Sequence, residues 1–74
     1  MTLQEAKIGV TYVIASMDLD QATSRRLGVL GLTKGTKIKV LNRNLGGATI
    51  LMVRGSRLAL GKKITQTIHM GETV

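Results

Sequence analysis

The sequence predicts a mainly β fold: a small closed barrel of about five strands, with one helix inserted after the first strand. Short runs of β-branched or alternating apolar residues are separated by turn formers roughly every eight to twelve positions, which is typical of small barrels and sandwiches. A chain of 74 residues is too short for a second core, and closure of so small a sheet protects its edges. We therefore expect one domain over residues 1–74.

The N-terminal segment predicts a helical turn followed by a strand. Thr2 and Glu5 have the spacing of a capping box, so residues 2–7 should form a short helical turn before Gly9 interrupts it. Residues 11–17 are rich in β-branched side chains and contain no breaker, which favours a strand.

Residues 21–30 should form the single helix. Asp18 and Asp20 both offer N-caps for it. Gly31 stands where a left-handed C-cap residue belongs, and Leu32 can fold back onto the last turn in a Schellman motif.

The predicted helix has an apolar side and a basic side. Thr23, Leu27 and Leu30 recur at the spacing of one helical face, so we expect them to pack against the sheet. Arg25 and Arg26 then point outward.

Four further strands should follow the helix, at residues 37–43, 49–54, 57–60 and 65–70. Glycine-containing segments at 44–48 and 61–63 supply a hairpin loop and a turn. Alternation along 37–43 predicts one exposed and one buried face. The exposed face comprises Lys37, Lys39, Leu41 and Arg43, and the opposite face comprises Ile38, Val40 and Asn42.

The sequence offers no convincing set of residues for catalysis. It contains one His, no Cys and four acidic residues, and two of the acids are already expected at the start of the helix. A general base needs an orienting partner and a pocket that tunes its pKa, and His69 with Glu72 near the C-terminus supplies neither. We therefore predict that the protein is not an enzyme.

A metal site is not predicted either. The candidate ligands are His69 and the acids Glu72, Asp18 and Asp20, and they show no recognised ligand spacing. The absence of Cys removes thiolate sites altogether. We expect no cofactor, while weak binding of a divalent ion near His69 stays open.

The charge balance predicts an acidic partner. Eleven Lys and Arg against four Asp and Glu leave a net charge of +7. Single-stranded nucleic acid is disfavoured because its bases usually stack on aromatic side chains, and Tyr12 is the only aromatic residue. Duplex nucleic acid bound through its phosphates stays open, as do an acidic protein surface and the anionic face of a membrane.

No segment predicts membrane insertion or export. No apolar run approaches the roughly 20 residues that a bilayer requires, and the N-terminus lacks the features of a signal peptide. Together with the lack of Cys, this predicts a cytoplasmic location.

One motif is specific enough to compare with known families. The pattern R-L-x-x-L-G-L-x-x-G spans residues 26–35, where a helix C-cap and a tight turn explain the two glycines. Around it, in a characteristic order, lie Gly9, Gly35-Thr36-Lys37-Ile38-Lys39-Val40, Gly46-Gly47-Ala48, Leu58-Ala59-Leu60, Ile64 and Ile68. From about residue 3 to residue 70, the chain resembles the FeoA family, the ferrous iron transport proteins A.

The resemblance implies both a fold and a function. It implies an SH3-like barrel and a cytosolic accessory protein that binds the cytoplasmic part of the FeoB ferrous iron transporter. It also implies kinship with the SH3-like domains of metal-dependent repressors, so a metal-responsive module is an alternative. Lys34, Gly47-Ala48 and Ile64 depart from the family pattern, which often has Pro, Asp-Pro and Ala at these places.

Within this interpretation, the partner should bind basic residues and one exposed leucine. Arg beside apolar side chains is typical of interface cores. The predicted partner-binding residues are Arg25 and Arg26 on the helix, Arg54 and Arg57 around Gly55, and Leu41 on the strand at 37–43, with Leu51 or Val53 as further apolar surface beside it.

Overall fold

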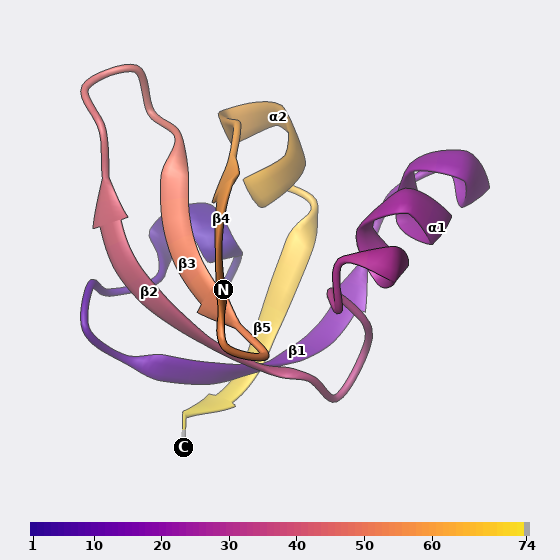
Figure 1. Ribbon diagram of the computed structural model, residues 1–74, viewed down its shortest axis with the longest axis horizontal. Helices are drawn as coiled ribbons and strands as arrows, with labels where there is room; N and C mark the ends of the chain where they lie inside the picture. The colour runs from indigo at the N-terminus through magenta and orange to yellow at the C-terminus, as the bar shows by residue number, and fades with distance from the viewer. Residues whose placement is uncertain (74) are drawn as a thin grey trace.

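The computed structural model describes residues 1–73, and the side chain of Glu72 lies outside what it describes. Its elements in chain order are the 3-10 turn η1 (Leu3–Glu5), β1 (Thr11–Met17), α1 (Gln21–Val29), β2 (Lys37–Arg43), β3 (Thr49–Val53), β4 (Ser56–Leu60), α2 (Lys62–Thr65) and β5 (Ile68–Thr73). Figure 1 shows their arrangement.

The five strands form one antiparallel sheet in the order β4-β3-β2-β1-β5. The sheet curls around a common interior, with α1 projecting from one side of it (Figure 1). In the described part of the chain, β4 and β5 do not pair with each other, so the barrel is open between them, and the prediction that it closes completely is wrong. α2 connects the two edges. The predicted mainly β fold with a helix after the first strand is confirmed.

The core is aliphatic, as expected for a chain with one aromatic residue. Tyr12 is buried and its hydroxyl oxygen accepts a hydrogen bond from the backbone N–H of Lys7 at 3.0 Å. The other buried apolar side chains are Leu3, Ala6, Ile14, Leu27, Leu32, Ile38, Val40, Leu51, Val53, Leu60, Ile68 and Met70. Burial of each larger aliphatic side chain contributes about 1.5 to 3 kcal/mol before conformational entropy is subtracted.

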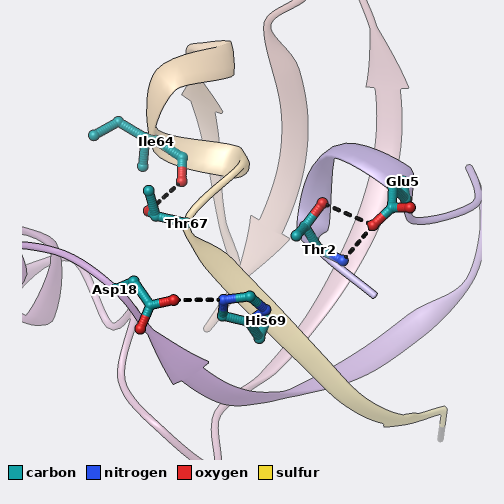
Figure 2. A network of polar contacts seen from close by, with 6 residues as sticks. All are labelled: Thr2, Glu5, Asp18, Ile64, Thr67 and His69. Carbon is teal, nitrogen blue, oxygen red and sulfur yellow. Dashed lines mark hydrogen bonds and ion pairs between the residues drawn. The ribbon is translucent and has the colours of Figure 1, made fainter.

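The prediction of a strand over residues 65–70 is wrong at its start. The chain forms the short helix α2 through Thr65, and β5 begins only at Ile68. The Thr65 hydroxyl is buried and donates to Oε1 of Gln4 at 2.7 Å, a contact between segments far apart in the sequence. The Thr67 hydroxyl then donates to the carbonyl oxygen of Ile64 at 2.7 Å, where the helix ends (Figure 2).

The alternation predicted along β2 is interrupted by a β-bulge. Val40 lies opposite Leu51, but Asn42 lies opposite Ile50, so Leu41 is an extra residue in the ladder. A bulge of this kind reverses which side chains face the interior beyond it. Leu41 is half-buried, while Leu51 and Val53 are buried in the core rather than exposed beside it.

The bulge turns Arg43 away from the exposed face on which we expected it. Its Nη2 donates to the carbonyl oxygen of Leu3 at 3.0 Å and to that of Ala6. Leu3 begins η1 and its carbonyl oxygen also accepts from the backbone N–H of Ala6 at 3.2 Å, while Ala6 is the residue just after η1. The Arg43 side chain therefore connects η1 to the sheet, and we assign it a role in stability.

α1 stands clear of the sheet (Figure 1). Leu27 is its only buried residue. Thr23 is half-buried and Leu30 is 49% exposed, so the predicted apolar face packs on the sheet through Leu27 alone. Leu32, beyond the helix, occupies the interior instead.

Candidate partner-binding surface

The end of α1 is locked by the predicted Schellman motif. The backbone N–H of Leu32 donates to the carbonyl oxygen of Leu27 at 3.0 Å, and that of Gly31 donates to Gly28, also at 3.0 Å. Gly31 has a φ of +97°, which glycine adopts without the Cβ clash that other residues suffer. Because Leu27 and Leu32 are both buried, this one turn fixes how the helix leaves the barrel.

A shallow groove lies between α1 and the segments that precede and follow it. Its lining residues are Leu19, Gln21, Ser24, Arg25, Gly28, Val29 and Thr33. Val29 is 84% exposed, and Leu30 beside it is 49% exposed. Val29 and Arg25 on the helix, with Leu30 at its C-cap, form the combination of aliphatic side chains and arginine that protein interfaces favour.

A basic notch adjoins this groove. Lys34, Lys37 and Arg54 line the notch together with Thr33, Gly35 and Thr36. Thr33 lines both depressions, so groove and notch meet at this residue. The notch lies where the connection from α1 to β2 meets the turn between β3 and β4.

Acidic groups within the described residues are engaged elsewhere. The carboxylate of Glu5 accepts from the backbone N–H of Thr2 at 2.9 Å and from its hydroxyl at 3.1 Å (Figure 2), and these bonds lower the pKa of Glu5. Asp20 caps the N-terminus of α1, and its hydrogen bonds with the hydroxyl and backbone N–H of Thr23 lower its pKa. No described acidic side chain lines the notch.

The structure brings together only part of the predicted set. Arg25 lies in the groove and Arg54 in the notch, and both depressions share Thr33. Arg26 is exposed in the last turn of the same helix. Arg57 is exposed on β4 opposite Met52 of β3, and Leu41 lies at the bulge of β2; neither lines the groove or the notch.

We predicted that Arg54 ends the strand that begins at residue 49, but β3 ends at Val53 and Arg54 lies outside it. It lies in the turn after β3 with a φ of 49°, a left-handed conformation that is uncommon outside glycine. Its side chain crosses the end of α1: a Cβ built on Gly31 would lie 3.0 Å from the Arg54 Cδ. This contact brings Arg54 beside the helix that carries Arg25.

Sequence reasoning missed several residues of this surface. We expected Lys37 only as an exposed strand residue and considered Lys34 only as a departure from the family pattern, although both flank the turn glycine that follows the helix. Val29 was assigned no role. Its exposure follows from the way the Schellman motif holds the helix away from the sheet, which no local pattern reveals.

His69 has a partner that the sequence did not suggest. Its Nε2 lies 2.7 Å from Oδ2 of Asp18 (Figure 2), across 51 positions of sequence. Asp18 therefore pairs with β5, and the prediction that it caps α1 is wrong; Asp20 is the cap. The side chain of Glu72, which we considered beside His69 and rejected as its catalytic partner, lies outside what the structure describes.

Comparison with known proteins decides the family. The FeoA domain matches residues 1–70. The chain belongs to the FeoA family. It is 32% identical over 63 residues to a Methanocaldococcus jannaschii protein assigned as Fe(2+) transport protein A, covering 85% of this chain and 76% of that protein.

Two solved FeoA structures show the same fold. FeoA from Chlorobium tepidum has a TM-score of 0.87 and 31% identity, covering 95% of this chain and 68% of that one. FeoA from Stenotrophomonas maltophilia, solved with zinc, has a TM-score of 0.79 and 28% identity, covering 96% of this chain and 89% of that one. The latter is described as a prokaryotic SH3 domain protein and a candidate activating factor of ferrous iron transport. The expected SH3-like fold is confirmed.

Two further findings bear on what this FeoA chain can do. Within the described residues, no three His, Cys, Asp or Glu side chains are grouped as a metal ion would require. Nor does any helix in residues 1–73 combine the length and apolar character needed to cross a membrane.

Proposed function

We propose that this FeoA chain is a non-enzymatic, cytoplasmic accessory protein of ferrous iron uptake that docks on an acidic surface of the cytoplasmic part of a FeoB-type transporter. The observation that supports this proposal is the free face of α1. It presents Val29 and Leu30 beside Arg25 and Arg26, and it adjoins a notch lined by three cations. Ferrous ion is the cargo of the transporter and needs no site on this chain.

The proposed contact combines burial of aliphatic side chains with electrostatic attraction. Burial of exposed aliphatic side chains contributes about 25 cal/mol for each Å² removed from water, which stabilises the complex once formed. The arginines and the net charge of +7 attract an acidic partner and speed encounter, because complementary charges act mainly on the association rate. Binding should therefore weaken steeply as ionic strength rises.

A charge-reversal variant tests the docking face. In Arg25→Glu/Arg26→Glu, two exposed cations become anions, and we expect loss of capture by the cytoplasmic domain of the transporter together with impaired iron uptake. The matched control is Lys62→Glu/Lys63→Glu on α2, which changes the net charge equally at exposed residues that line neither depression. Circular dichroism should show both variants folded, since each exposed charge near a helix end alters stability by only about 0.3 to 1 kcal/mol.

The outcome separates this face from a general charge effect. Equal loss of capture in both variants would mean that net charge alone drives binding, and unchanged iron uptake in the arginine variant would refute the assignment of the docking face.

A gel-shift titration with duplex DNA at low salt tests the alternative of phosphate-mediated nucleic-acid binding. An affinity that falls with salt for every duplex sequence would support that alternative.

A further inference from the structure

The notch beside α1 has the composition of an anion-binding site. Lys34, Lys37 and Arg54 line it with three positive charges, and Thr33 and Thr36 add hydroxyl groups. No ion pair joins a Lys or Arg to an acid among the side chains that the structure describes. The three cations are thus left to be neutralised by solutes.

Arg54 has an unusual backbone conformation and packs against the end of α1. The left-handed backbone at φ 49° costs a non-glycine residue about 1 to 2 kcal/mol, which Gly or Asn would largely avoid at this turn. The side chain also packs along Gly31, whose hypothetical Cβ would lie 3.0 Å from Cδ and 3.4 Å from Nε. Packing along Gly31 restrains the aliphatic part of this exposed side chain, so less conformational entropy is lost there when the guanidinium binds a ligand.

Two backbone N–H groups of the notch are already engaged, which leaves its side chains as the main donors. The backbone N–H of Gly35 already donates to Ile14 at 2.8 Å, and that of Thr36 donates to Thr33 at 3.1 Å. The hydroxyls of Thr33 and Thr36 lie 2.8 Å apart and hydrogen bond to each other. One of these two hydroxyls donates within the pair, so the hydrogen of the other is available to a ligand.

These donors suit a phosphate better than a carboxylate. A phosphate group carries a charge of about −1.5 to −2 at neutral pH and three strongly accepting oxygens. A carboxylate carries one charge and two oxygens, which a single arginine can satisfy. Two lysines, one arginine and a hydroxyl exceed what one carboxylate can use.

We propose that this notch binds the phosphate groups of a small phosphorylated ligand, through Arg54, Lys34 and Lys37. The inference goes beyond transporter docking and does not depend on it. Phosphate on a soluble compound and phosphate on a lipid headgroup present the same chemistry to these side chains, and the experiment below separates them.

The test is an NMR titration of the isotope-labelled chain with inorganic pyrophosphate at low salt. We expect the largest amide shifts at residues 33–37 and at Arg54. Arg54→Asn should weaken binding roughly tenfold or more, because a charge-assisted hydrogen bond is lost. Asn tolerates the left-handed turn, so this variant should fold. Lys63→Gln removes one charge on α2, which Figure 1 shows at the opposite end of the molecule, and should leave the affinity unchanged.

Three results would overturn the proposal. These are shifts spread over all basic residues, equal weakening in Arg54→Asn and Lys63→Gln, or equally tight binding of citrate, which has a charge similar to that of pyrophosphate but no phosphate group.

A second arm of the experiment uses vesicles that contain phosphatidic acid. Tighter Arg54-dependent binding to vesicles than to pyrophosphate assigns the ligand to a lipid headgroup, and the reverse order assigns it to a soluble phosphate. Since the titration needs no transporter, its result is independent of the charge-reversal test of docking.

Discussion

Arg43 lies on a strand whose other basic residues face solvent, yet its guanidinium bonds to two carbonyls of the N-terminal segment. Alternation predicted the opposite orientation because it assumes a regular ladder. The bulge at Leu41 depends on how β2 pairs with β3, and single-strand patterns carry no information about pairing. The orientation of a strand residue in this chain can therefore be predicted from alternation only as far as the first β-bulge.

Replacing Arg43 should therefore cost stability. In Arg43→Met the aliphatic volume is kept while the carbonyls of Leu3 and Ala6 lose their charged donor. We expect the free energy of unfolding in urea to fall by roughly 1 to 3 kcal/mol. Lys39→Met, at an exposed position of the same strand, should change it by less than about 0.5 kcal/mol. Equal effects would contradict the structural assignment of Arg43.

The elements themselves follow the sequence closely where local signals decide them. The bounds of β1 agree with those predicted from its β-branched residues, and the bounds of β2 agree with those predicted from its alternation. α1 begins at the residue that the capping signal predicts. α2 was missed because the burial of Thr65 is set by its contact with Gln4, 61 positions away. For the same reason the basic notch was not anticipated: Arg54 joins Lys34 and Lys37 only through the tertiary fold.

The two glycines at the end of α1 should respond oppositely to alanine. Gly28 is helical, and a Cβ there would meet only Thr33 Cγ2 at 3.6 Å, so Gly28→Ala should stabilise the protein by about 0.5 to 1 kcal/mol. Gly31 has a positive φ and contacts Arg54, so Gly31→Ala should destabilise it by about 1 to 2 kcal/mol. Thermal melts of both variants check the pair, and a shared sign would contradict this account.

The N-cap of α1 should contribute to acid sensitivity. The pKa of Asp20 is lowered in the folded state, so its contribution is present above the ordinary pKa of 3.8 and is lost as pH falls through the folded value. Asp20→Asn keeps a capping side chain that does not titrate. We expect the melting temperature of this variant to fall less than that of the parent between about pH 5 and about pH 2.5. Parallel pH curves for the two proteins would argue against the effect.

At the scale of the whole molecule, folding brings basic side chains close together, and few acidic side chains balance their charge. The acids described are bound to Thr2, Thr23 and His69, and the net charge is +7. Composition predicted this excess and the attraction to an acidic partner. It did not predict that groove and notch would share one flank of the molecule, because that depends on the Schellman turn and on the β3–β4 turn together.

The excess charge should also make the fold respond to salt. Raising the sodium chloride concentration from about 20 mM to about 0.5 M shortens the Debye length to within a few Å and weakens repulsion between the cations. We expect the melting temperature to rise by a few degrees. Neutralising Lys34 and Lys37 to Gln should reduce this rise, and a melting temperature that is flat or falls with salt would contradict the expectation.

α1 enters the core through Leu27 and takes no part in the strand ladder. Mutations on its outer side can therefore accumulate at little cost to the barrel, which lets partner choice diverge between relatives that keep one architecture. A chimera that retains Leu27, Gly31 and Leu32 but takes its remaining helical residues from another FeoA should therefore fold as before, and under the proposed docking it should also acquire the donor's preference for a transporter.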